Sequence, residues 1–196
     1  TRNDGLREAT VLSLSYGRIV VKPSDSLHGL VPASFETYQI VEPGDIVLRP
    51  TDLQNDQKSL RLGLSEYHGI ITSAYMCLRV TNVMIPEYGY LLLHAYDLQK
   101  VLYGLGSGLR QNLAWKDLRD LLCLLPPLDE QAAIVAHHGR VAMRVESAIG
   151  HAQQEVALLR EFRTRLIADV VTGAVDVRAA AAALPDEADE PLEPED

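Results

Sequence analysis

Two polar stretches hold the side chains of this 196-residue chain that are best suited to chemistry at a surface. The longer stretch covers residues 49–75, and its candidate residues are Arg49, Gln54, Asn55, Lys58, Arg61, Tyr67 and His68. The shorter stretch is SGLRQN at 107–112, where glycine allows a close backbone approach beside Arg110, Gln111 and Asn112. Forked Arg, Asn and Gln side chains match base edges, whereas Lys, Ser, Thr and backbone amides suit phosphates. The composition of these loops is compatible with nucleic-acid contact, but an ordinary solvated loop has the same composition, so composition alone does not favour base reading.

The motifs do not support an enzyme. The run GLGSGLRQ has Leu109 where a dinucleotide-binding fingerprint needs glycine, and Arg110 is not the lysine that a P-loop requires. His137 and His138 are adjacent, so on a helix their side chains point about 100° apart, and no H-E-x-x-H accompanies them. We therefore predict no catalytic residue and no metal site. A hydrolase that uses this histidine pair or scattered carboxylates is the weak alternative.

The charge, the cysteines and the length of the apolar runs limit which kinds of protein the chain can be. The chain has a net charge of −9, but seven acidic residues and no basic residue follow Arg178, and the remaining chain holds 20 acidic against 18 basic residues. The main part is thus nearly neutral, which leaves DNA binding open. Two isolated cysteines predict a reduced, cytoplasmic setting. The longest apolar run, at 121–128, is shorter than the ~18 residues of a membrane span.

Hydrophobic periodicity divides the chain into three parts. Short apolar runs separated by Gly, Pro and Asp predict strands at 10–15, 18–21, 38–41, 45–48, 69–72 and 74–80. Helical spacing predicts one helix over 86–104 within this region. Residues 1–127 are therefore predicted to form a mixed, mainly β domain. Residues 128–178 are predicted to form a long helix, and the acidic residues 179–196 a disordered tail.

The long helix carries an apolar stripe that needs a partner. From Glu130 to Thr172 the pattern spans 43 residues, roughly 65 Å of helix. Its stripe repeats in steps of three and four residues, and the predicted coiled-coil seam is Ile134, Val141, Val145, Ala148, Ala152, Leu159, Phe162 and Leu166. A small domain cannot cover so long a stripe, which favours a coiled coil. A helix that folds back on its own domain is the alternative.

The order of the motifs resembles one family. The succession YQIVEPGDIVLRPTDLQND, GIITSAYMCLRV, GLGSGLRQNL, PPLDEQAAI and FRTRLIADVVTGAVDVR resembles the specificity subunit of type I restriction-modification enzymes. It matches one target recognition domain followed by one conserved helical region, and it covers about residues 1–178. The resemblance implies an α+β fold and a non-catalytic subunit. The chain departs from the family in having one recognition domain and one helix instead of two of each, which favours a carboxy-terminal half.

The resemblance also implies partners. Such subunits read one half of a bipartite site in double-stranded DNA with each recognition domain. In such subunits, two helices pair in an antiparallel coiled coil, and this coiled coil binds the methyltransferase subunits. A restriction or translocase subunit can join the complex. S-adenosylmethionine, ATP and Mg are expected on those partners and not on this chain. The helix needs a second recognition half or a second copy of the chain.

The resemblance places DNA contacts by position in the loops. The predicted set is Arg49, Thr51, Asn55, Lys58, Arg61, Tyr67, His68, Ser107, Arg110, Gln111 and Asn112. Arg61, Arg110 and Gln111 are expected to read bases or phosphates. Leu128, Glu130, Gln131 and Ile134 are interpreted as a hinge where the helix leaves the domain. A coiled-coil interaction scaffold without a DNA role is the competing hypothesis.

Overall fold

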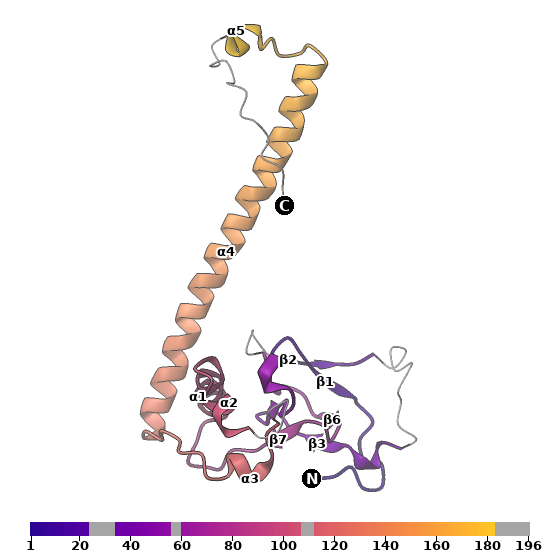
Figure 1. Cartoon of the computed structure of the whole chain (residues 1–196), viewed down its shortest axis with the longest axis vertical. Coiled ribbons are helices and arrows are strands. Elements are labelled where there is room, and N and C mark those ends of the chain that lie inside the picture. Colours follow the sequence, from indigo (N-terminus) through magenta and orange to yellow (C-terminus); the bar gives the residue numbers. More distant parts are fainter. Residues whose placement is uncertain (24–33, 56–59, 107–111, 183–196) are drawn as a thin grey trace, which may run out of the picture. The chain divides into compact units, whose positions relative to one another are not determined.

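The computed structural model describes residues 1–23, 34–55, 60–106 and 112–182. The chain divides into two compact units, Thr1–Gly139 and Arg140–Asp196. The first unit includes the first turns of the long helix and therefore extends past the domain boundary that we predicted at residue 127. Small antiparallel sheets and a long helix together confirm the predicted α+β class (Figure 1).

Within the described residues, the first unit contains three small antiparallel sheets. They are the hairpin β1–β2, the pair β3–β6 and a three-stranded sheet in the order β5–β4–β7. The strands are β1 (Leu12–Ser15), β2 (Arg18–Val21), β3 (Gln39–Val41), β4 (Ile46–Leu48), β5 (Leu62–Leu64), β6 (Gly69–Ile71) and β7 (Met76–Leu78). Two 3-10 turns, η2 (Phe35–Thr37) and η3 (Leu53–Asn55), follow loops between them. Six of these strands fall on predicted runs, which confirms the strand pattern.

The central strand β4 forms the centre of the core. All three of its residues are buried, and successive side chains point to opposite faces of the sheet. Ile46 and Leu48 pack with Leu62 and Leu102 on the face that carries helices. Val47 packs on the other face with a group of four buried residues: Leu12, Ile19, Val41 and Ile71. The continuous apolar run of β4 is therefore explained by burial on both sides.

Strand β5 was not predicted, because RLGL lies in a stretch that we interpreted as a polar loop. Its middle residue, Gly63, pairs with Val47 of β4. A Cβ atom at Gly63 would lie 2.8 Å from Leu14 Cδ1 and 2.9 Å from Ile19 Cδ1. The hairpin β1–β2 thus packs directly on the backbone of β5, and a side chain at this position would displace the ends of Leu14 and Ile19.

The helix predicted over 86–104 is two helices. Helix α1 (Pro86–Leu98) begins with proline at its first turn, and α2 (Val101–Leu105) follows after a break. Lys100 lies between them with φ of 60°, a left-handed conformation that a continuous α-helix does not allow. Helix α1 contacts β4, β5 and α2. A third short helix, α3 (Trp115–Leu118), precedes the segment that leads to the long helix.

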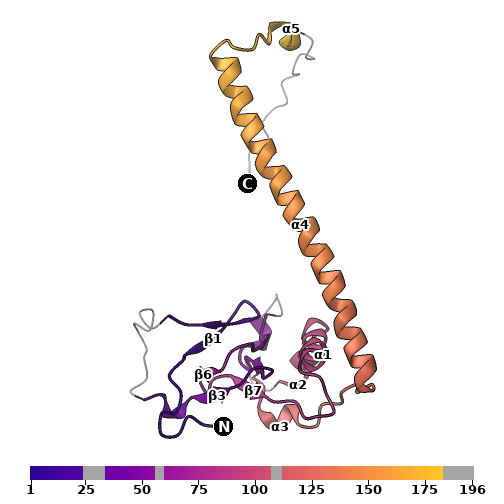
Figure 2. The same cartoon turned by 180° about the vertical axis from the view of Figure 1, so that it is seen from behind.

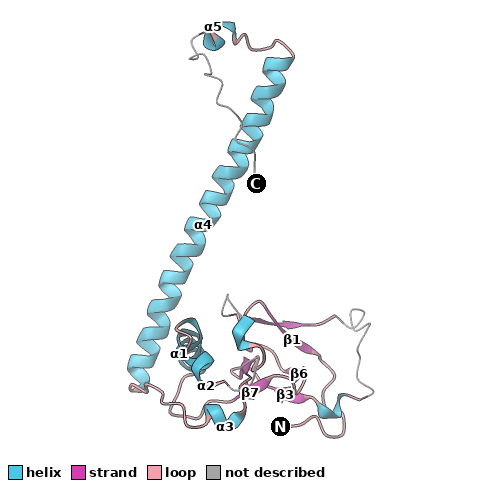
Figure 3. Cartoon of the chain, viewed as in Figure 1, coloured by secondary structure: helices cyan, strands magenta, loops and turns pink. Residues whose placement is uncertain are grey.

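The long helix α4 (Leu128–Val171) is a single uninterrupted helix of 44 residues, roughly 66 Å long, as Figures 1 and 3 show. This confirms the predicted long helix, although it ends at Val171, seven residues before the predicted end at residue 178. Acidic residues occupy its first turn, where their negative charge interacts favourably with the positive end of the helix dipole. Figure 2 shows the same uninterrupted path from behind.

The predicted seam of α4 is uncovered in the isolated chain. Its apolar side chains keep from 40% exposure at Ile134 to 64% at Phe162, and Ala148 and Ala152 are exposed as well. Coiled-coil pairing itself stays a prediction. After α4, a turn at Gly173 leads to the one-turn helix α5 (Arg178–Ala181). The first residues of the expected disordered tail are therefore helical, and 183–196 lie outside the described residues.

Candidate nucleic-acid interface

Two of the predicted contact stretches meet in space. The amide N–H of Asp52 donates to Asn112 Oδ1 at 2.9 Å, and the N–H of Leu113 donates to the carbonyl of Pro50 at 2.8 Å. Arg49, Thr51 and Asn112 are all exposed. We call residues 49–52 and 112 the paired loops. They bring a cation, a hydroxyl and an amide together, a combination that suits a nucleic-acid surface.

Arg61 lies beneath the paired loops and not on them. It is 1% exposed, and its Nε lies 3.1 Å from Asp97 Oδ1 of α1, a carboxylate that is also buried. Its Nη1 donates to the carbonyls of Arg49 at 3.3 Å and Thr51 at 3.4 Å. Arg61 therefore supports the backbone that carries Arg49 and Thr51. This burial contradicts the DNA-reading role predicted for Arg61, because the side chain cannot reach a duplex.

Tyr67 and His68 lie at the other end of the sheet. Strands β4 and β5 pair with Leu48 opposite Leu62 and Ile46 opposite Leu64. The paired loops follow Leu48, whereas Tyr67 and His68 follow Leu64. Both side chains are exposed, but the register separates them from Arg49 and Thr51 by the length of the strand pair. Their contact with DNA stays a prediction.

Four predicted contact residues lie outside the described residues: Lys58, Ser107, Arg110 and Gln111. Asn55 ends the turn η3, which belongs to the same segment as the paired loops, and its side chain is likewise not described. DNA contact by these five residues therefore stays a prediction.

His68 is held between two carboxylates. Its Nδ1 lies 2.6 Å from Glu42 Oε2, and its Nε2 lies 3.0 Å from Glu8 Oε2. The hydrogen bond to Glu42, followed by the charges of Glu42 and Glu8, raises the pKa of His68 above its usual value, although burial opposes the shift. Hydrogen bonds from the backbone and side chain of Thr10, and from the Ala9 amide, lower the pKa of Glu8 to about 2.

This cluster predicts a pH-dependent contribution to stability. Because the pKa of His68 is raised in the folded state, its stabilising effect is complete below the unfolded pKa, about 6.5, and is lost as pH rises through the folded pKa. His68→Gln should therefore destabilise the chain by less than about 1 kcal/mol at pH 5.5, because solvent screens the half-exposed ring. Urea unfolding between pH 5.5 and 8.5 measures it. A difference that does not shrink with rising pH would contradict the assignment.

A second ion pair fixes the turn at Gly44 and Asp45. Gly44 has φ of +88°, and Asp45 Oδ2 accepts the amide N–H of Glu42 at 2.8 Å. Arg79 donates to both Asp45 oxygens, at 2.7 and 2.6 Å. Burial alone raises the pKa of Asp45, but the Arg79 and Glu42 hydrogen bonds outweigh it and keep the pKa below its usual value. The sequence indicated the turn residues but not Arg79 as their partner.

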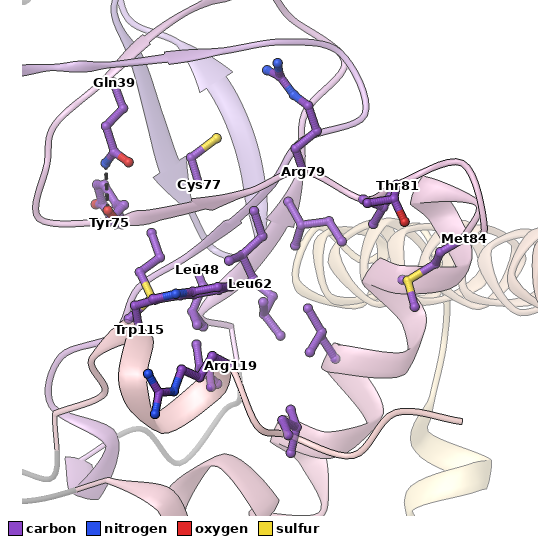
Figure 4. A pocket seen from close by; sticks show the side chains of 18 of the residues that line it. Gln39, Leu48, Leu62, Tyr75, Cys77, Arg79, Thr81, Met84, Trp115 and Arg119 are labelled. Atoms are coloured by element: carbon purple, nitrogen blue, oxygen red, sulfur yellow. Dashed lines mark hydrogen bonds between the residues drawn. The ribbon is translucent and has the colours of Figure 1, made fainter. Parts of the chain in front are cut away.

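An open cavity of about 1100 Å³ lies between the sheet β5–β4–β7 and the helices α1 and α3 (Figure 4). Leu48, Leu62 and Trp115 are among its apolar lining residues. None of its described lining residues is Asp, Glu or His, and His137 and His138 are exposed on α4, away from this lining. Burial raises the pKa of Cys77, which lines the cavity, to about 12, so its thiol is a poor nucleophile. The weak hydrolase alternative therefore gains no support from this cavity.

The described residues contain neither a metal-binding cluster nor a helix suited to cross a membrane. Within them, no group of three or more His, Cys, Asp or Glu side chains is arranged to hold a metal ion. In the same part of the chain, no helix has the length and apolarity needed to cross a membrane.

The described fold is of the α+β class, with small antiparallel sheets and one long helix. No protein-family model matches the chain, and no curated protein matches it. Among solved structures, it is similar to the HsdS subunit from Thermoanaerobacter tengcongensis, with 20% identity, a TM-score of 0.43 and coverage of 55% of this chain and 24% of that chain. It is also similar to a chain in a structure of the type I R-M system, with 20% identity, a TM-score of 0.48 and coverage of 83% of this chain and 39% of that chain. The chain thus spans well under half the length of either.

Proposed function

We propose that the chain is part of the DNA-specificity subunit of a type I restriction-modification system. In this role the first unit reads one half of a bipartite site, and α4 joins it to the rest of the complex. The chain itself performs no catalysis. The methyltransferase subunits, and the restriction subunit where one is present, carry S-adenosylmethionine, ATP and Mg. The order of the sequence motifs from the first strand to the end of α4 supports this proposal.

The observation that carries the proposal is α4. A helix of 44 residues with its apolar seam exposed is not expected to be stable in water unless another helix covers the seam. Six of the eight seam positions form pairs that are symmetric about the level of residue 150: Ile134 with Leu166, Val141 with Leu159, and Ala148 with Ala152. An antiparallel second copy would therefore set Ile134 against Leu166, Val141 against Leu159 and Ala148 against Ala152, whereas Val145 and Phe162 would face Glu155 and His138. A second recognition half would have to supply an equivalent helix.

The paired loops are the proposed DNA-reading surface. Arg49, Thr51 and Asn112 are exposed there, and the buried Arg61–Asp97 pair supports the backbone beneath them. Lys58, Ser107, Arg110 and Gln111 belong to segments that adjoin the paired loops in sequence, so they are part of the same proposal. The contacts of Tyr67 and His68 are proposed only as a separate, second contact, since the carboxylates of Glu8 and Glu42 surround His68 and disfavour a phosphate there.

A binding experiment tests this surface. Arg49→Ala should weaken binding of the assembled complex to its target duplex by ~1–3 kcal/mol, either for the correct base alone or for all duplexes if Arg49 contacts phosphate. Wild-type binding should also weaken as salt rises, because phosphate-bound counterions are released. The matched control is Arg7→Ala, an exposed arginine next in sequence to Glu8, whose carboxylate contacts His68 beyond the end of β5 that is opposite the paired loops. Equal losses for the two variants, or a flat salt response, would argue for the scaffold hypothesis instead.

A further inference from the structure

Gln131, in the first turn of α4, is completely buried and fully hydrogen-bonded. Its Oε1 accepts the amide N–H of Ile85 at 2.8 Å. Its Nε2 donates to the carbonyls of Val83 at 3.0 Å and Pro126 at 2.8 Å. One amide group therefore satisfies three backbone groups and uses both of its own N–H donors. Neither glutamate nor methionine can reproduce this pattern.

These bonds join α4 to two other segments of the first unit. Val83 and Ile85 belong to the loop that leads into α1, and Ile85 is the cap residue of α1, which has no side-chain cap of its own. Pro126 belongs to the segment that leads into α4. The start of α4 is therefore tied to the start of α1 by a buried side chain. A buried polar group of this kind is costly to displace, so the junction resists bending.

Helix α1 holds the same junction from a second side. The hydroxyl of Tyr88 donates to the carbonyl of Leu124 at 2.9 Å, and the hydroxyl of Tyr96 donates to the carbonyl of Leu122 at 2.9 Å. The segment between α3 and α4 is thus anchored along its length. The sequence suggested a hinge at Leu128 to Ile134, whereas the hydrogen bonds of Gln131 anchor the start of this region to the first unit.

We infer that Gln131 is a positioning residue that makes the complex selective for the length of the spacer between two DNA half-sites. This inference rests on the proposed function. One extra base pair moves a half-site by about 3.4 Å and rotates it by roughly 35° around the duplex. A reading domain fixed rigidly to its helix cannot follow this displacement, so binding to the wrong spacing is lost. A loose junction would absorb it.

The test is a selection from a duplex library with about 30 randomised base pairs, using the assembled complex with the full chain. The wild type should enrich two short half-sites at one spacing, by about tenfold or more over spacings one base pair longer or shorter, because a displaced half-site loses at least one base contact and tenfold corresponds to ~1.4 kcal/mol. Gln131→Met, which keeps the size but loses all three hydrogen bonds, should enrich the same bases while that preference falls to about threefold or less.

The control is Gln154→Met, the same substitution at an exposed position on α4, which should behave as the wild type. If Gln131→Met does not fold, Tyr96→Phe removes one anchoring bond with a minimal change and should broaden the spacing in the same direction. Unchanged spacing selectivity in a folded Gln131→Met, or in Tyr96→Phe if that variant must stand in, would overturn the inference. A wild type that enriches no sequence would instead overturn the proposed function.

Discussion

Leu159→Asp is expected to abolish pairing of α4 with a second helix. Leu159 lies on the exposed seam at 60% exposure, and in an antiparallel pair it faces Val141 of the partner helix. Burying an unpaired carboxylate there, with the loss of the leucine contacts, should cost at least ~3 kcal/mol. That corresponds to a loss of association of about a hundredfold or more. Sedimentation of the full chain over a range of concentrations measures it.

Met143→Asp is the matched control for this experiment. Met143 is as exposed as Leu159, at 64%, but about 200° around α4 from Val141, so it lies opposite the seam. This variant should associate as the wild type does, and the helical circular dichroism of both variants should be unchanged. Equal effects of the two substitutions would show that the predicted seam is not the interface. A wild-type chain that stays monomeric at high concentration would contradict pairing with a second copy.

Asp97→Ala is expected to destabilise the first unit by ~3–5 kcal/mol, because it removes the ion-pair partner of a guanidinium with only 2% of its side chain exposed. Replacing both members, as Arg61→Met with Asp97→Leu, should recover much of this loss, since no charge then remains buried. Urea unfolding of the full chain at neutral pH gives both values.

An exposed ion pair provides the comparison. Arg119 and Asp120 form a pair with most of each side chain in solvent, and Asp120→Ala should cost less than about 1 kcal/mol. If Asp97→Ala costs no more than Asp120→Ala, the Arg61–Asp97 pair does not support the paired loops. The loops should also lose protection from hydrogen exchange in Asp97→Ala before the rest of the first unit does.

The local hydrophobic pattern of the sequence was sufficient to predict the long helix and most of the strands. Helix α4 follows from a sustained apolar stripe with acidic residues after two prolines, and strands such as β2 and β3 follow from short runs between turns. Strand β5 could not be predicted, because Gly63 is explained only by the packing of Leu14 and Ile19 from another hairpin. The break at Lys100 was missed for a related reason, since a lysine gives no local signal for a left-handed conformation.

The candidate site could be predicted only in outline. Composition indicated Arg49 and Asn112, and the resemblance added Thr51, but their meeting depends on the Asp52–Asn112 hydrogen bond across 60 residues of sequence. Arg61 has the same side chain as Arg49, and only the position of Asp97 on α1 shows that one is buried and the other exposed. Gln131 was interpreted as part of a hinge, because two of its three backbone partners, Val83 and Ile85, lie 48 and 46 residues away in sequence and only the tertiary structure brings them to it.

Sequencing the methylation pattern of the host genome tests the central claim most directly. With the gene intact, we expect a split motif of two short half-sites at one fixed spacing to be methylated. Deleting the gene should remove methylation at that motif alone, and Arg49→Ala should reduce it or relax its sequence. A methylation pattern that is identical with and without the gene, in a host that expresses the chain, would contradict the proposal that this chain directs a methyltransferase to DNA.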